Sequence, residues 1–147
     1  MAWTLTLRAY PLSGNRTLRM HWVNYRKLMI QWFWMVRTAH GLASIPGPTG
    51  RRRLTIQLHG RQAIDRDNRY AACKPLVDVL RPAKHESGVY KSGKKKGLSW
   101  NRQRLGLGLI VDDDDVHLDL QVPPVLKVEK DEDPFVTLTL EDLENAS

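Results

Sequence analysis

Apolar and polar residues alternate in four short stretches of the chain, which is the pattern of half-buried β-strands. In the first stretch Trp3, Leu5 and Leu7 fall on one face, and polar residues fall on the other. The other three stretches lie at 54–58, 116–122 and 135–140. The pattern therefore predicts a sheet built from these four strands.

Two stretches between the strands show helical spacing of apolar residues instead. In the first, from 17 to 40, Ile30, Phe33 and Trp34 widen the apolar stripe beyond what one sheet face needs. This surplus has two interpretations, a thick core helix or a surface that packs against a second subunit. The second helix follows "DRDN" (65–68), and Pro75 predicts that it either bends or begins anew at Lys74.

The predicted order is β-α-β-α-β-β, which is typical of an α/β (α+β) chain with a small mixed sheet packed by two helices. A length of 147 residues suits a single domain, residues 1–147. The segment 84–104 departs from these patterns, because it holds seven Lys and Arg residues against one Glu and is rich in glycine. We expect a mobile basic loop there, inserted in the domain, with Tyr90 and Trp100 embedded in it.

Several features indicate the surroundings in which the protein acts. The single Cys73 excludes an internal disulfide, suits a reducing cytoplasm and is expected to serve in packing. The start of the chain alternates where a signal peptide would need an apolar run, and the longest apolar stretch, 28–36, is short of the ~20 residues of a membrane span. The histidines lack metal-ligand spacing, so zinc is not expected. These features predict a cytoplasmic protein without a membrane partner.

The net charge of +7 conceals a division of the charges along the chain. Residues 1–110 hold 21 of the 23 basic residues and 4 of the 16 acidic ones, whereas residues 111–147 hold 2 basic and 12 acidic residues. A mixed, solubilising surface would not separate its charges in this way. The basic part therefore indicates a polyanionic partner, with nucleic acid first.

Asp65 and Asp67 are the first acidic residues of the chain, and they stand among arginines. Two residues apart in an extended segment, they project to the same side. Asp113 precedes another strand, at 116–122. Asp113 can therefore meet Asp65 and Asp67 if the end of this strand is adjacent to the end of the strand at 54–58. Such carboxylates repel one another and bound phosphates, and a divalent cation such as Mg2+ removes that conflict. The arrangement is what metal-assisted phosphodiester cleavage requires.

Two simpler interpretations stay open for these carboxylates. Asp67 is a suitable helix cap, and the acidic run 112–115 is a suitable solvated turn. However, an acidic pair within a basic segment weakens polyanion binding unless it does something that a neutral residue cannot. This argument favours the metal site.

Three segments, in this order, resemble the RusA family of Holliday-junction resolvases, which phages and prophages often carry. "TLRAYPLSGNR" resembles the opening strand and turn of the family, and "DRDN" followed by "KPLVDVL" resembles its D-x-D-N motif and the helix bearing a Lys and an Asp. "VDDDDVHLDL" resembles its D-D-x-x-V motif. The segments extend over nearly the whole chain apart from the basic loop.

The resemblance implies a RusA-like fold and a homodimer that resolves branched DNA by paired nicks in recombination and repair. It implies Mg2+ as cofactor, with Mn2+ as a substitute and no small-molecule cofactor, in a bacterial or phage-infected cell. Asp65, Asp67 and Asp113 would be the catalytic, metal-binding carboxylates, with Asp112 as a neighbouring acid at the metal. Lys74 would be the lysine of the family, which stabilises developing negative charge.

The sequence departs from the family pattern at Lys74, which follows Asp67 by seven residues where the pattern has four. Lys74 stays on nearly the same face of the helix as in the family pattern, but its distance from Asp67 along the helix axis grows by about 4.5 Å. This departure supports the alternative of a branched-DNA-binding protein of the same fold without nuclease activity. In either case we expect stacking on Tyr90 or Trp100, and phosphate contacts from Arg66, Arg69, Lys91, Lys94, Lys95, Lys96, Arg102 and Arg104.

Overall fold

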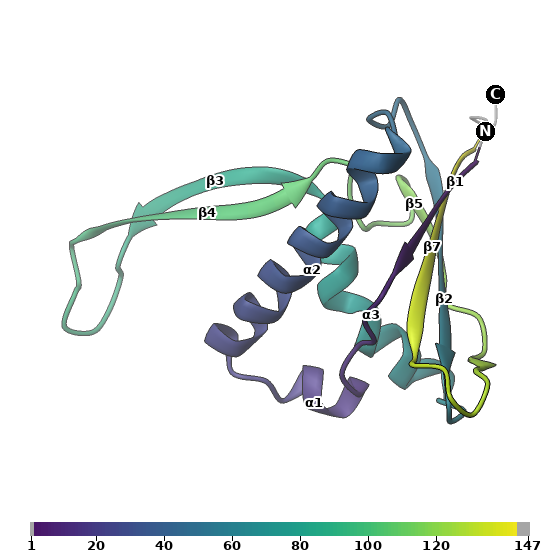
Figure 1. Ribbon diagram of the computed structural model, residues 1–147. Coiled ribbons are helices and arrows are strands. Elements are labelled where there is room, and N and C mark those ends of the chain that lie inside the picture. The colour runs from purple at the N-terminus through teal and green to yellow at the C-terminus, as the bar shows by residue number, and fades with distance from the viewer. Residues whose placement is uncertain (1, 144–147) are drawn as a thin grey trace.

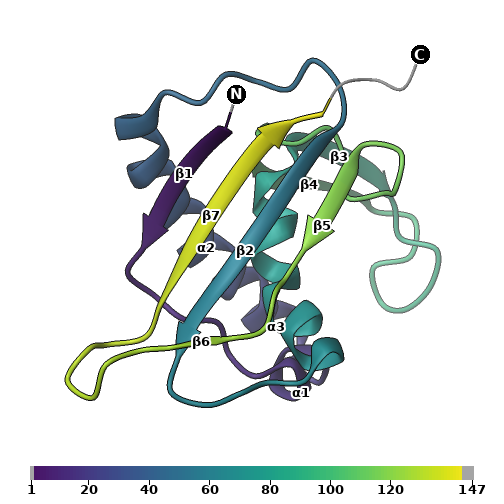
Figure 2. The ribbon, with the colours of Figure 1, turned by 90° about the vertical axis from the view of Figure 1, so that its right-hand side faces the viewer.

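The computed structural model describes residues 2–143, apart from the side chains of residues 42 and 43, as a mixed sheet with helices on one of its faces and a hairpin that projects from the body (Figures 1 and 2). The α+β class expected from the sequence is confirmed. The elements are β1 (Ala2–Leu7), α1 (Gly14–Leu18), α2 (Trp22–Ala43), β2 (Arg52–Gly60), α3 (Arg66–Leu80), β3 (Pro82–Val89), β4 (Ser99–Leu107), β5 (Leu118–Gln121), β6 (Leu126–Lys127) and β7 (Phe135–Asp142).

The main sheet has the strand order β1-β7-β2-β5. β7 pairs with β1 and with β2 in antiparallel fashion, whereas β5 pairs with β2 in parallel. The short β6 also pairs in parallel with β2, at its far end. All four predicted strands are therefore found, and the sheet is mixed as expected.

Alternation along the strands places the core on one face of the sheet. In β2, Leu54, Ile56 and Leu58 are fully buried, while Thr55 and Gln57 on the other face are half-buried. Trp32 and Val36 of α2 and Leu76 and Leu80 of α3 belong to the same buried cluster. Burial of this apolar surface stabilises the two-layer arrangement.

The first predicted helix is divided into two in the structure. The side chain of Ser13 accepts a hydrogen bond from the backbone N–H of Arg16 and caps α1, and the side chain of His21 accepts one from Val23 and caps α2. Of the apolar surplus on α2, Phe33 is buried, whereas Trp34 is 55% exposed. The surplus is therefore only partly used by the core of this chain.

The second predicted helix, α3, is one continuous helix with Pro75 inside it. The expectation that it begins anew at Lys74 is not met. Cys73 on this helix is fully buried, and burial raises the pKa of its thiol to about 12. Its predicted role in packing is confirmed.

The expected basic loop at 84–104 is instead mostly an antiparallel hairpin of β3 and β4, which projects from the body beside α2 (Figure 1). Its tip is closed by hydrogen bonds of 2.9 Å between the backbones of Tyr90 and Leu98 and of Gly97 and Tyr90. Gly93 and Gly97 adopt positive φ, which the turn requires. The loop prediction was wrong. Neither β3 nor β4 has a buried residue, so their sequences lack the alternation of apolar and polar residues by which a strand is predicted.

Within residues 2–143, none of the helices combines the length and apolar character that crossing a membrane would require.

Candidate functional site

Lys74 and Asp113 are in direct contact, although 39 positions separate them in the chain. The Lys74 ammonium donates to Asp113 Oδ2 at 2.5 Å and lies 3.0 Å from Asp78 Oδ1. Lys74 and Asp78 are one turn apart on α3, and Asp113 lies in the acidic turn that precedes β5. The contact therefore brings together two of the segments that carry the resemblance to the resolvases.

Arg81, just past the end of α3, joins the same group. Its guanidinium lies 3.5 Å from Asp112 Oδ1, 3.6 Å from Asp78 Oδ1 and 3.9 Å from Asp113 Oδ2. We call these five residues, Lys74, Asp78, Arg81, Asp112 and Asp113, the α3 cluster. It holds three acids against two bases, and Asp112 is 48% exposed, so the cluster can be reached from solvent.

The contacts within the cluster fix the charges of its members. The hydrogen bond from Lys74 holds the pKa of the Asp113 carboxyl below its ordinary value. Burial works to lower the pKa of Lys74, but hydrogen bonds to Asp113 and Asp78 outweigh it, so that this pKa is raised. Lys74 and Asp113 are therefore an ion pair at neutral pH.

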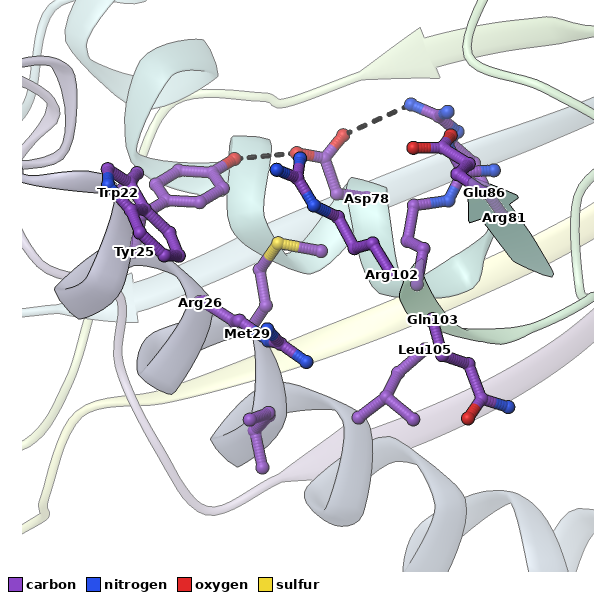
Figure 3. Close-up of a pocket in the computed structure, with 12 residues that line it drawn as sticks. Trp22, Tyr25, Arg26, Met29, Asp78, Arg81, Glu86, Arg102, Gln103 and Leu105 are labelled. Atoms are coloured by element: carbon purple, nitrogen blue, oxygen red, sulfur yellow. Dashed lines mark hydrogen bonds and ion pairs between the residues drawn. The ribbon is translucent and has the colours of Figure 1, made fainter. Parts of the chain in front are cut away.

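Tyr25 of α2 holds the other oxygen of Asp78. Its hydroxyl donates to Asp78 Oδ2 at 2.6 Å, and the chain from Tyr25 through Asp78 to Arg81 is visible in Figure 3. Burial and this hydrogen bond raise the pKa of Tyr25 well above its ordinary range, so it remains a neutral donor. Asp78 is thereby fixed between α2 and Lys74.

The acidic run 112–115 is partly a structured turn, as one of the simpler interpretations predicts. Asp114 Oδ1 accepts hydrogen bonds from the backbone N–H groups of Val116 and His117, at 3.0 and 2.9 Å, and contacts the His117 ring at 2.8 Å. Asp113 instead faces Lys74. Within the run, Asp114 shapes the turn and Asp113 belongs to the cluster.

Asp65 and Asp67 lie at the opposite end of α3. Asp65 is its N-cap and accepts hydrogen bonds from the backbone and side-chain nitrogens of Asn68, at 3.0 and 2.8 Å. These bonds, the backbone one first, lower the pKa of Asp65. Asp67, the residue considered as a cap, is instead 97% exposed. Seven residues of helix, about 10 Å along its axis, separate Asp67 from Lys74, so the structure does not bring Asp65 and Asp67 together with Asp113.

The donor set for a metal ion is therefore smaller than the sequence predicts. Among residues 2–143, no three His, Cys, Asp or Glu side chains form a group that could hold a metal ion. Mg2+, however, is commonly held by one or two carboxylates together with waters and substrate phosphates. Asp112 and Asp113 are two such carboxylates, and both lie beside the guanidinium of Arg81, a positive charge that a bound cation would replace.

The predicted phosphate-binding residues fall into two groups. Arg69 is engaged within the fold, because its guanidinium donates to the backbone carbonyls of Val122 and Ile64 at 3.0 and 2.7 Å. Arg104 is half-buried, with a long hydrogen bond of 3.4 Å to the carbonyl of Pro82. The remaining predicted contacts are exposed and are Arg66 on α3, Lys91, Lys94, Lys95 and Lys96 at the hairpin tip, and Arg102 on β4.

Sequence reasoning missed Tyr25 and Arg81 as members of the site. A signal for Arg81 exists, since Lys74, Asp78 and Arg81 are spaced by four and three residues and share one helix face. Tyr25 had no such signal, because its contact with Asp78 depends on how α2 packs against α3.

Comparison of the chain with models of protein families, with curated proteins and with solved structures gives no match.

Proposed function

We propose that the protein is a RusA-like, Mg2+-dependent endodeoxyribonuclease that cuts branched DNA, with the four-way junction as its substrate in recombination and repair. The observation that carries the proposal is the contact between Lys74 and Asp113. The resemblance to the resolvases implies that these two residues share a site, and they meet even though the lysine is displaced by three positions.

The residues of the α3 cluster have distinct roles in this proposal. Asp112 and Asp113 would hold Mg2+ together with the scissile phosphate. Bound there, the ion would make a water more acidic and neutralise charge on the phosphate. Lys74 stabilises the negative charge that develops on the phosphate oxygens. Asp78, fixed by Tyr25 and Arg81, positions the Lys74 ammonium.

The projecting hairpin supports binding to the phosphate backbone. Its tip presents Lys91, Lys94, Lys95 and Lys96, all exposed, on an arm that extends away from the body (Figure 1). Lysines contact phosphates as point charges without reading the base sequence. The arm therefore suits a substrate recognised by its shape.

The homodimer is part of the same proposal. Leu18, Val23 and Trp34 are exposed on α1 and α2, with Leu18 exposed by 74%. Large exposed apolar side chains are common at protein interfaces. Two subunits related by a twofold axis would match a four-way junction and place one cut in each of two strands.

The decisive experiment is incubation of a synthetic four-way junction with the protein, in Mg2+ and in EDTA. We expect symmetric paired nicks in Mg2+ or Mn2+ and intact strands in EDTA, with binding in both conditions. Denaturing gels of junctions labelled on each strand measure the cuts, and native gels measure the binding. Tight binding without nicks in either metal would contradict the nuclease proposal.

That outcome would support a second candidate, a branched-DNA-binding protein of the same fold without nuclease activity. A specific observation favours it, because Asp65 and Asp67 stand apart from Asp113, and Asp65 is occupied as a helix cap. Both candidates share the basic arm, and only the nicks distinguish them.

Replacing Lys94, Lys95 and Lys96 by alanine is expected to weaken junction binding by at least about tenfold at low salt, because each phosphate contact releases counterions. The slope of log K against log salt should become shallower by about 0.9 for each lysine that contacts a phosphate. Binding isotherms at several salt concentrations measure both effects. As a control, Lys127→Ala/Lys130→Ala on the edge of the body should bind like the wild type. An unchanged slope in the triple variant would exclude the hairpin tip as a phosphate contact.

A further inference from the structure

A groove runs between α2 and the hairpin and consists of two adjoining hollows. The inner hollow, of about 300 Å3, lies between α2, the end of α3 and the base of the hairpin (Figure 3). The outer hollow, of about 220 Å3, lies nearer the hairpin tip. Trp22, Arg26 and Arg102 line both hollows, so the two form one continuous feature. We call it the α2–hairpin groove.

Aromatic side chains gather around the outer hollow. Trp22 is 64% exposed and Tyr90 is 38% exposed, and Trp100 completes the lining. Cations lie over two of these rings, with Arg102 at 5.5 Å from the centre of Trp100 and Lys95 at 5.7 Å from that of Tyr90. Aromatic rings flanked by cations are the surface on which unpaired bases stack while their phosphates are neutralised.

The charges of the groove match a nucleic-acid strand that enters from the outside. Among the described residues that line the outer hollow there are two arginines, Arg26 and Arg102, and no acid. The inner hollow adds two arginines, Arg81 and Arg104, and two acids, Asp78 and Glu86. Arginines therefore outnumber acids in both hollows, so the groove favours the phosphates of a nucleic-acid strand.

We propose that the α2–hairpin groove binds an unpaired segment of single-stranded DNA. Its bases stack on Trp22, Tyr90 and Trp100, and its phosphates contact Arg26 and Arg102. Duplex DNA does not fit this mode, because its bases are already stacked on one another and are not free to cover the exposed rings.

The groove also leads toward the α3 cluster. Asp78 lines the inner hollow, accepts from Tyr25 at one oxygen and lies 3.0 Å from Lys74 at the other. The inner hollow therefore reaches Asp78 and Arg81 of the α3 cluster, and a strand in the groove would end one side chain away from the Lys74–Asp113 pair. This last step rests on the proposed function, whereas the binding of the strand does not.

The test is titration of the intrinsic tryptophan fluorescence with oligo(dT) of about ten nucleotides, a length within the site sizes of known single-strand binders. We expect the wild type to be quenched, and Trp22→Ala/Trp100→Ala to lose most of the quenching and to bind at least about tenfold more weakly. Trp34→Ala is the matched control, because Trp34 is also an exposed tryptophan of α2 but does not line the groove. All groove residues come from one subunit, so loss of a subunit contact through Trp34 would leave the groove intact.

A second pair of variants tests the groove without touching the hairpin. Arg26→Glu should weaken oligo(dT) binding by about tenfold or more at low salt, whereas Arg37→Glu, also exposed on α2, should leave it nearly unchanged. Equal affinities of the Arg26→Glu and Arg37→Glu variants, or equal quenching of the double tryptophan variant and the wild type, would overturn the proposal. So would tighter binding of oligo(U) than of oligo(dT), which would indicate an RNA site.

The two proposals fail separately. If the protein cuts junctions but the variants of Trp22, Trp100 and Arg26 bind oligo(dT) like the wild type, the groove proposal is wrong and the nuclease proposal stands. If these variants weaken oligo(dT) binding but the protein does not cut junctions, the nuclease proposal is wrong and the groove proposal stands.

Discussion

Replacing Asp113 by asparagine is expected to reduce junction cutting in Mg2+ by about a hundredfold or more, while junction binding stays equal or becomes tighter. Asparagine keeps the shape of the side chain and can still accept from Lys74, but it removes the negative charge that a cation needs. Removal of that charge also lessens repulsion of the DNA phosphates. Single-turnover cutting with protein in excess separates the chemical step from binding.

Asp67→Asn and Asp65→Asn are the matched variants for this experiment. Asparagine caps helices about as well as aspartate, so Asp65→Asn retains α3. From the separation along α3, we expect both variants to cut within a few-fold of the wild-type rate. The resemblance to the resolvases implies the opposite result. Loss of cutting in all three variants, with folding intact, would show that the three carboxylates act together and would contradict a site confined to the α3 cluster.

Replacing Arg52 by methionine is expected to lower the free energy of unfolding by about 3–5 kcal/mol. Arg52 is only 1% exposed, and its guanidinium donates to Asp142 at 2.7 Å and to the carbonyls of Leu109 and Pro46 at 2.8 Å. It also lies 5.0 Å from the centre of the Trp3 ring. Methionine fills part of the volume but leaves those carbonyls without a donor. Urea denaturation measures the loss.

Arg53→Met provides the control for Arg52→Met. Arg53 is the next residue of β2, and it pairs with Asp119 at 2.8 Å on the exposed face of the sheet. Exposed ion pairs contribute little to stability because solvent screens them. A loss of stability as large as that of the Arg52 variant would contradict the role given to the buried network.

The strands β1, β2 and β7 could be predicted from the sequence because each buries one face, and burial imposes the alternation that the sequence displays. The hairpin could not, since β3 and β4 lie mostly in solvent and have no face to mark. The division between α1 and α2 was also missed, because its cap at His21 is of a residue type that seldom signals a helix start.

For the candidate site, the sequence predicted Lys74, Asp112 and Asp113, but it did not predict Tyr25 and Arg81 or where the members lie. Asp113 could be predicted as a partner of Lys74 only through the resemblance, since 39 positions separate the two. Asp67 lies in the first turn of α3, so the expectation that Asp65 and Asp67 project to the same side, which requires an extended segment, is not met. The two-residue spacing places both residues at one end of the helix. It does not show which end of α3 the acidic turn packs against, because that depends on how the chain between β4 and β5 crosses the helix.

The projecting hairpin has a consequence for the native-state motions of the protein. A lone two-stranded ribbon is marginally stable in water, and β3 buries none of its eight residues fully. Opening of the arm therefore requires much less free energy than unfolding of the body. Its amide protons should exchange with deuterium long before those of β2 and β7, and a bound polyanion should slow that exchange first at the tip.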